Sequence, residues 1–319
     1  MGERIGIVWN PSKVEEAELR DALSVALAES PGHEEADCLW FETTVDDPGQ
    51  GAAAEALEQG CDLVIAAGGD GTVRAVAERL GESGAAAAEL GLVPLGTGNL
   101  LARNLGVPLG DARAAFALAL AGTASPLDLG EVRSRTADGA EERRGFVVMV
   151  GFGIDAQMIV ETDDELKAKA GWLAYVESLG RAASSTEVVE ASLSLDGGDP
   201  SPVPAHTLLV ANCGSIQGGI TLLPDAAPDD GELDLLVLSA DTAGAWFDTM
   251  KNMMWDNGLK RLVAGGGTAE SSESTTHLRA REVRVELPEP LAFEIDGEDV
   301  GEVAAFEVRI LPGALRVRG

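Results

Sequence analysis

An apolar run that ends in a cluster of glycines constrains this chain more than any other feature. Leu63–Ala67 has the length and composition of a buried strand, and Gly68-Gly69-Asp70-Gly71-Thr72 follows it directly. Val73–Leu80 then has helical character. A strand, a glycine turn and a helix in this order are typical of βα units, so we expect a parallel sheet flanked by helices.

The same order recurs through the first third of the chain. Leu92–Leu95 leads into Gly96-Thr97-Gly98-Asn99, with a helix expected from Leu100, and Ile5–Trp9 ends at Asn10-Pro11. The intervening segments are the helices Glu15–Ser30 and Gly51–Gln59 and the strand Cys38–Glu42. Ligands of such folds bind beyond the carboxyl ends of the strands, where these loops would converge.

From Leu127 onward the pattern changes to short, closely spaced strands, which predicts an antiparallel sandwich or barrel. Two helical stretches interrupt it, Thr162–Ala183 and Ala243–Val263, and a loop is expected around Gly265–Thr276. The expected strands are Leu127–Arg133, Gly145–Gly151, Glu187–Leu195, Thr207–Asn212, Leu233–Leu238, Glu282–Leu287, Leu291–Ile295 and Glu307–Leu311. The predicted fold is therefore an α/β N-terminal domain with a parallel sheet, followed by a β-rich antiparallel C-terminal domain.

The charge balance excludes one class of partner. The chain carries 54 Asp and Glu against 23 Lys and Arg, a net charge of −31, so its overall field repels the phosphates of nucleic acids. A phosphate group must be held locally, by oriented backbone amides or by a metal ion. Hydrophobic residues make up 45% of the chain, which excludes disorder and supplies a core.

Cysteines and apolar runs bear on the cellular compartment. Three scattered cysteines predict buried thiols rather than a disulfide framework or a zinc site. Met1–Trp9 lacks the pattern of a signal peptide, and no run reaches the length of a membrane-spanning helix. We expect a cytoplasmic protein that is soluble or at most peripheral to a membrane.

The glycine loop at residues 68–72 predicts a phosphate site. Its backbone amides can approach a ligand closely, and the helix that begins near Val73 directs its positive end to the same place. Asp70 would repel a phosphate unless a divalent cation is also bound. A tight strand-to-helix turn is the alternative interpretation, but the second glycine loop at residues 96–99 favours a nucleotide site. Neither a P-loop nor a dinucleotide fingerprint is present.

Five motifs in this order resemble the diacylglycerol kinase catalytic-domain family, which includes bacterial diacylglycerol kinases and is similar to sphingosine and ceramide kinases. The motifs are Asn10-Pro11, Gly68–Thr72, Leu95–Asn99, Pro224-Asp225-Ala226 with Asp229-Asp230-Gly231, and Asp296-Gly297-Glu298. The resemblance implies a nucleotide-binding α/β kinase domain at 1–126, to which residues 303–319 return, and a lipid-substrate β-sandwich at 127–302. The active site would lie between the two domains.

The resemblance also implies roles for single residues. Glu298 would be the general base, and Asp70 and Asp128 would hold a catalytic metal or a hydrogen-bond network. A surface hairpin turn is the plain alternative for the Asp296-Gly297-Glu298 motif. One departure is Lys13-Val14, where the family often has Ser-Gly. The residues expected to line the nucleotide are Asn10, Pro11, Ser12, Lys13, Val14, Thr43, Gly68, Gly69, Asp70, Gly71, Thr72, Val73, Arg74 and Thr97.

The resemblance places a structural Mg²⁺ in the acidic turn that follows Pro224. Its ligands would be the Asp230 side chain and the backbone carbonyls of Ala227 and Glu232, since hard oxygen donors suit Mg²⁺. A solvated acidic loop is the alternative. The Trp- and Met-rich stretch Ala243–Val263 is interpreted either as a core helix or as a lipid-contacting helix.

Together these features predict an ATP- and Mg²⁺-dependent lipid kinase that most closely suits diacylglycerol. Such an enzyme would bind membrane lipid peripherally, at the inner face of the cell membrane, and a homodimer is compatible with it. The alternatives are a kinase for a sphingoid base or another lipid, an NAD kinase that shares the first glycine motif, and a non-catalytic lipid or nucleotide sensor. No nucleic-acid partner is expected.

Overall fold

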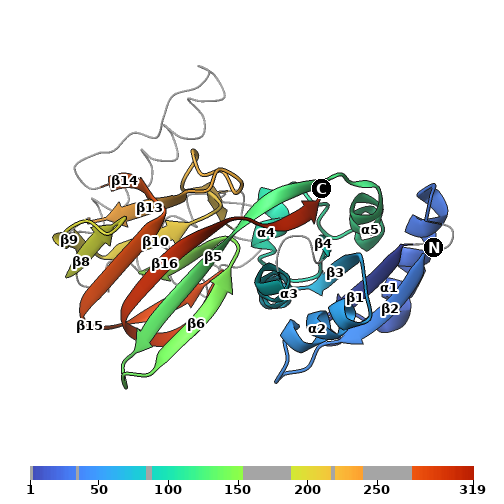
Figure 1. The fold of residues 1–319 in the computed structure, drawn as a ribbon, viewed down its shortest axis with the longest axis horizontal. Coiled ribbons are helices and arrows are strands. Elements are labelled where there is room, and N and C mark those ends of the chain that lie inside the picture. The colour runs from blue at the N-terminus through green and yellow to red at the C-terminus, as the bar shows by residue number, and fades with distance from the viewer. Residues whose placement is uncertain (1–2, 34–35, 84–87, 154–187, 217–219, 240–274) are drawn as a thin grey trace, which may run out of the picture.

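The computed structural model describes residues 3–33, 36–83, 88–153, 188–216, 220–239 and 275–319. The chain forms two lobes that lie side by side, an α/β lobe that carries the N-terminus and a β-rich lobe (Figure 1). The predicted helices Thr162–Ala183 and Ala243–Val263 lie outside the described residues. In the part of the chain that is described, no helix is both long and apolar enough to cross a membrane.

The α/β lobe is built on four parallel strands in the order β2-β1-β3-β4. Their apolar side chains form the centre of the larger hydrophobic core; β3, for example, is buried along its whole length. This burial on both faces explains their continuous apolar sequence. The strands are β1 (Arg4–Trp9), β2 (Asp37–Glu42), β3 (Leu63–Gly68) and β4 (Glu89–Pro94).

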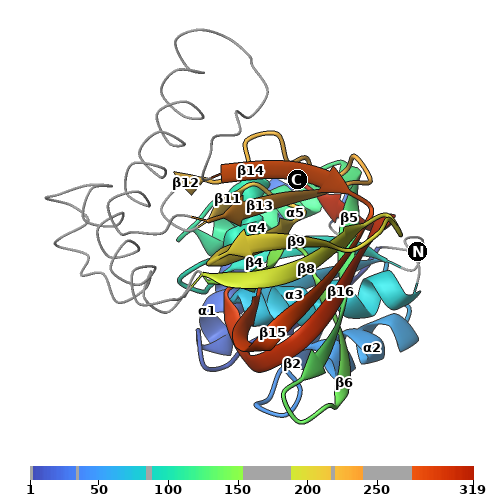
Figure 2. The same cartoon turned by 90° about the vertical axis from the view of Figure 1, so that its left-hand side faces the viewer.

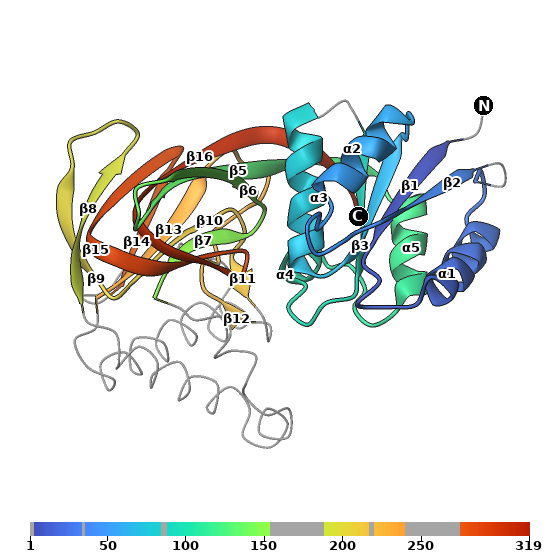
Figure 3. The ribbon, with the colours of Figure 1, turned by 90° about the horizontal axis from the view of Figure 1, so that it is seen from below.

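Helices cover both faces of this sheet. α1 and α5 lie on one face, and α2 and α3 lie on the other, where α3 also faces the β-rich lobe (Figure 3). The helices are α1 (Glu16–Glu29), α2 (Gln50–Glu58), α3 (Asp70–Ser83), α4 (Leu100–Asn104) and α5 (Ala112–Ala121). α5 was not expected, and its N-terminus is capped by the Asp111 side chain, which accepts from the Ala114 N–H at 2.9 Å.

The β-rich lobe consists of antiparallel strands around a second apolar core, which includes Phe146, Phe293 and Phe306. In Figure 2, which faces this lobe, β8, β15 and β16 cross in front of the helices. The strands are β5 (Ala124–Thr136), β6 (Glu141–Phe146), β7 (Met149–Phe152), β8 (Val189–Leu195), β9 (Ser201–Ala205), β10 (Thr207–Ala211), β11 (Ser215–Ile216), β12 (Ile220–Thr221), β13 (Leu233–Leu238), β14 (Thr275–Ala280), β15 (Glu282–Ile295) and β16 (Glu298–Arg318).

A ribbon of two long strands, β5 and β16, joins the lobes. The strands pair antiparallel from the Val303–Thr136 end to Arg318–Ala124, and the end of β16 pairs parallel with β4 at Val317 and Leu90 (Figures 1 and 3). The sheet is therefore continuous between the lobes.

The predicted fold class, an α/β domain followed by a β-rich sandwich, is confirmed, but several boundaries differ. β9, Ser201–Ala205, is not among the expected strands. It pairs only with β8 among the described strands, an edge position that tolerates its two prolines. The two strands expected within 282–295 are one strand, β15. It passes through the Pro288 and Pro290 region with a register shift between Glu286 and Leu291.

Candidate active site

The carboxyl ends of the parallel strands and the β15–β16 turn enclose a cavity of about 550 Å³. Loops that are far apart in sequence contribute to its wall, as the strand-loop-helix pattern predicts. The lining residues are Asn10, Lys13, Thr44, Val45, Pro48, Gly69, Asp70, Gly71, Thr72, Gly96, Thr97, Asp296, Gly297, Glu298 and Asp299.

The first wall of the cavity is the turn after β1. The Asn10 N–H donates to the Ala67 carbonyl at 3.0 Å, which fastens this turn to the end of β3. The Asn10 side-chain oxygen accepts from the Ser12 N–H at 2.9 Å and from the Ser12 hydroxyl at 2.7 Å. Asn10 therefore shapes the turn with both its backbone and its side chain, and Lys13 lines the cavity beyond it.

The two glycine loops touch one another. A Cβ atom placed on Gly96 would lie 2.7 Å from the Gly69 Cα, closer than any real side chain allows. The Leu95 N–H donates to the Gly68 carbonyl at 2.9 Å across the same junction. Glycine is thus required here for close approach of two backbones. On the cavity side, a Cβ on Gly71 would meet only the Glu298 carboxylate at 3.8 Å, which leaves the cradle open for a ligand.

Asp70 links the first glycine loop to the second. Its carboxylate accepts from the Asn99 N–H at 2.8 Å and from the Leu100 N–H at 2.6 Å, at the start of α4. Burial raises the pKa of Asp70, and the two backbone N–H groups oppose that rise. Both carboxylate oxygens therefore have backbone partners, and the predicted role of Asp70 toward a metal stays a prediction.

Asp296 fixes the turn between β15 and β16. It is 3% exposed, and its carboxylate accepts from the N–H groups of Val147, Val148 and Met149 at 2.8–3.0 Å. Its backbone has φ of 51°, in the left-handed region that Asp tolerates better than most residues. Burial raises the pKa of Asp296 to about 6, although the three N–H groups favour the charged form. Sequence reasoning quoted this motif but gave Asp296 no role.

Glu298 follows this rigid turn and reaches the cavity. Its side chain is 55% exposed, and its carboxylate pairs with the guanidinium of Arg74 from α3. Of the residues predicted to line the nucleotide, Asn10, Lys13, Gly69, Asp70, Gly71, Thr72 and Thr97 lie on the cavity wall with Glu298.

The remaining predicted nucleotide residues lie behind or beside the wall. Thr43, for example, is 3% exposed, and its N–H extends the β1–β2 ladder by donating to the Trp9 carbonyl at 2.9 Å. Their roles stay predictions. The residues in this group are Pro11, Ser12, Val14, Thr43, Gly68, Val73 and Arg74.

Several wall residues were not predicted. They lie in the loop after β2, in the second glycine loop, or in and directly after the Asp296-Gly297-Glu298 motif, so their position beyond a strand end was the available signal. These residues are Thr44, Val45, Pro48, Gly96, Asp296, Gly297 and Asp299.

Asp128 is off the wall of the cavity. It is 1% exposed, and its carboxylate accepts from the Gly231 N–H at 2.7 Å and the Gly313 N–H at 2.6 Å. Its own N–H donates to the Pro228 carbonyl at 2.8 Å. Asp128 therefore ties β5 to the 224–232 turn and to the bulge in β16, and its predicted catalytic role stays a prediction.

Two of the three oxygen donors proposed for a structural Mg²⁺, the Asp230 carboxylate and the Ala227 carbonyl, have protein partners, and the site stays a prediction. The Asp230 carboxylate pairs with Arg279 and accepts from the Glu232 N–H at 3.0 Å, and the Ala227 carbonyl accepts from the Asp230 N–H at 3.4 Å. Arg279 also pairs with Glu232 at 2.9 Å and with Asp234 at 3.3 Å. A guanidinium thus already supplies positive charge to these carboxylates, and a metal ion would have to displace it.

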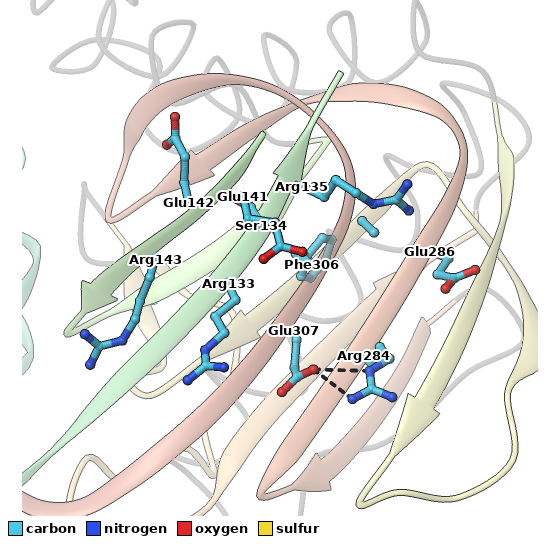
Figure 4. Close-up of a pocket in the computed structure, with 11 residues that line it drawn as sticks. Arg133, Ser134, Arg135, Glu141, Glu142, Arg143, Arg284, Glu286, Phe306 and Glu307 are labelled. Atoms are coloured by element: carbon cyan, nitrogen blue, oxygen red, sulfur yellow. Dashed lines mark hydrogen bonds and ion pairs between the residues drawn. The ribbon is translucent and has the colours of Figure 1, made fainter. Parts of the chain in front are cut away.

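A second cavity, of about 540 Å³, lies on the exposed face of β5, β6, β15 and β16 (Figure 4). Arginines and glutamates alternate across it: Arg284 pairs with Glu307 at 2.8 Å, and Arg143 pairs with Glu131 nearby at 2.6 Å. The pattern is that of cross-strand ion pairs on a solvated sheet face. We therefore place the candidate active site in the first cavity.

Comparisons with known proteins identify the family. Residues 10–132 match the family described as "Diacylglycerol kinase catalytic domain", and residues 148–319 match the "YegS C-terminal NAD kinase beta sandwich-like domain". A "Probable lipid kinase YegS-like" of Stenotrophomonas maltophilia is 32% identical and covers 98% of this chain and 94% of its own length. A relative of the same description from Pseudomonas aeruginosa is 35% identical and covers 82% of this chain and 78% of its own length.

A solved structure has the same fold. "A putative diacylglycerol kinase from Bacillus anthracis str. Sterne" superposes with a TM-score of 0.70 at 21% identity and covers 99% of this chain and 97% of its own. The glycine loops, the Asp296–Glu298 turn and the sequence matches along both lobes agree, and the chain belongs to the diacylglycerol kinase catalytic-domain family, in the branch with a YegS-type C-terminal domain.

Proposed function

We propose that this chain is an ATP-dependent lipid kinase. It transfers the γ-phosphoryl group of ATP to the hydroxyl of diacylglycerol, which forms phosphatidic acid. The observation that carries the proposal is the position of Glu298, whose carboxylate lies over the Gly71 loop in the same cavity. A carboxylate beside a phosphate cradle can take the proton from a hydroxyl that attacks the γ-phosphorus.

The other wall residues have matching tasks. The open cradle at Gly69 and Gly71 lets backbone amides bind phosphate oxygens, and the N-terminus of α3 adds its positive dipole end. Lys13 supplies the ammonium group on this wall. A chain with a net charge of −31 can thus hold a nucleotide through local groups.

Mg²⁺ bound with the nucleotide would neutralise charge that develops on the phosphates. A carboxylate oxygen, the donor that Mg²⁺ prefers, lines the cavity on Asp299 and would hold it. Among the described residues no group of three or more metal-ligating side chains is present. Phosphate oxygens and water would then complete the coordination, as is common for Mg²⁺.

Transfer of labelled phosphate from ATP tests the proposal. Purified protein would be offered diacylglycerol, a sphingoid base and NAD in parallel, the last because the C-terminal family is described as NAD kinase-like. We expect labelled phosphatidic acid from the wild type and a large loss of rate in Glu298→Gln. Glu302→Gln, an exposed glutamate on the same strand, is the matched control. Full activity of Glu298→Gln would remove the base assignment, and labelling of NAD alone would replace the lipid by a dinucleotide.

We also propose that the chain meets its substrate at the cytoplasmic surface of a membrane as a peripheral protein. The net charge of −31 opposes docking on anionic lipid, and salt screens that repulsion. Sedimentation with phosphatidylglycerol vesicles should therefore increase as NaCl is raised from low to physiological concentration. Binding that weakens steadily with salt would mean that a local basic surface dominates instead.

A further inference from the structure

Arg74 is a buried cation in an acidic chain. It lies in the first turns of α3 and is only 7% exposed. A guanidinium keeps its charge at every physiological pH, so burial is costly unless anions surround it. Its direct partner is the carboxylate of Glu298.

A second anion, the fully buried carboxylate of Asp296, lies within electrostatic reach of the same guanidinium. Arg74 opposes the rise in the pKa of Asp296 that burial causes. Asp296 cannot follow Arg74, because three backbone N–H groups hold its carboxylate. Of these two anions, only Glu298 is in direct contact with Arg74.

Glu298 is the more exposed partner. It sits at the first position of β16, directly after the turn, and its side chain is 55% exposed. A half-exposed glutamate loses rotamer freedom only where a contact holds it. The contact available here is Arg74, which comes from the other lobe, on the helix that follows the Gly68–Thr72 loop.

We infer that Arg74 is a positioning residue that holds the Glu298 carboxylate over the glycine loop, in place of contacting the nucleotide itself. The inference rests on the proposed function. It agrees with the cavity lining, which includes Gly71 and Thr72 but not Arg74. Misplacement of a catalytic group by about 1 Å can cost on the order of 100-fold in rate, so the contact carries a measurable effect.

The test compares Arg74→Gln and Arg74→Lys with Arg79→Gln, a control on the same helix whose guanidinium pairs with Glu82. We expect Arg74→Gln to lower kcat roughly 10- to 100-fold. The dissociation constant of a non-hydrolysable ATP analogue should change less than about twofold, since the guanidinium would make no phosphate contact. Arg74→Lys should recover part of the rate because it keeps a positive charge, and Arg79→Gln should match the wild type. Analogue affinity that falls tenfold or more with kcat unchanged would overturn the inference.

A double-mutant cycle decides whether Arg74 acts through Glu298. In the Glu298→Gln background, Arg74→Gln should cause no further loss of rate, and additive losses would overturn the inference. The same cycle measured by urea unfolding needs no catalysis: non-additive midpoint shifts are expected if the ion pair forms. If the wild type phosphorylates lipid but the shifts in urea midpoint of the two variants are additive, the inference is rejected and the proposed function is kept. If the midpoint shifts are non-additive but the wild type phosphorylates no lipid, the proposed function is rejected and the ion pair is kept.

Discussion

Replacing Gly96 by alanine tests the contact between the two glycine loops. The new Cβ would lie 2.7 Å from the Gly69 Cα, whereas ordinary contacts begin at 3.4 Å. The loops would have to separate by several tenths of an ångström, because no side-chain rotation can move the new Cβ or the Gly69 Cα. The movement would strain the hydrogen bond from the Leu95 N–H to the Gly68 carbonyl, now 2.9 Å. Overpacking of this kind costs about 2 kcal/mol.

Gly69→Ala is the matched comparison, since it faces the same contact from the other side. Its Cβ would lie 3.5 Å from the Gly96 Cα, an ordinary distance, and would otherwise point into open space. We expect Gly96→Ala to lower Tm by roughly 3 °C and Gly69→Ala to leave Tm nearly unchanged. Gly69→Ala should still weaken binding of an ATP analogue, because its methyl group enters the cradle.

Thermal unfolding followed by circular dichroism, with calorimetric titration of the analogue, measures both effects. A Gly96→Ala protein that melts with the wild type would refute the close approach of the loops. If Gly69→Ala destabilised the protein more than Gly96→Ala, the expected order of the two variants would be wrong.

Three further predictions concern charged side chains. Asp128→Asn removes one acceptor from the N–H groups of Gly231 and Gly313, so its free energy of unfolding in urea should fall by about 3 kcal/mol, and an unchanged midpoint would contradict this. The pKa of Asp296 is raised from 3.8 to about 6, so its contribution to stability is complete below about pH 3.8 and is lost as pH rises to about 6. The stability of the wild type relative to Asp296→Asn should therefore drop by about 3 kcal/mol between pH 4 and pH 7, and a constant difference would refute the shift. Arg279→Met leaves the carboxylates of Asp230, Glu232 and Asp234 without their guanidinium, so Tm should fall and added Mg²⁺ should restore part of the loss. A fall in Tm that Mg²⁺ does not reverse would count against a requirement for a cation here.

Local patterns were sufficient to predict the four parallel strands of the first lobe and most of its helices, but not α5. The apolar run Leu63–Ala67 and the glycines that follow it predict β3, the turn and α3, because burial on both faces of a parallel sheet leaves a continuous apolar signal. The positions of the loops beyond the strand ends then follow from the topology of the sheet. The cavity formed by these loops is where the motifs had placed it.

Long-range partners could not be predicted in the same way. The pairing of Arg74 with Glu298 joins residues 224 positions apart, and no local pattern encodes it. The three N–H groups that bind Asp296 come from β7 and the segment before it, which pair with β15 only in the folded sheet. The sequence did not predict β9, because Pro202 and Pro204 are as typical of a turn as of an edge strand.

The β5–β16 ribbon has a consequence for how the chain can be divided. A fragment that ended near residue 126 would leave β4 without its neighbour in β16, and so would expose a sheet edge to other chains. A fragment that began there would carry the end of β16, with the buried side chains of Leu315 and Val317, but would lack β4 to pair with it. Neither half is therefore an independent module, although each matches its own family. The two lobes should fold only as one chain, and expressing them as separate fragments should yield aggregates in place of two soluble domains.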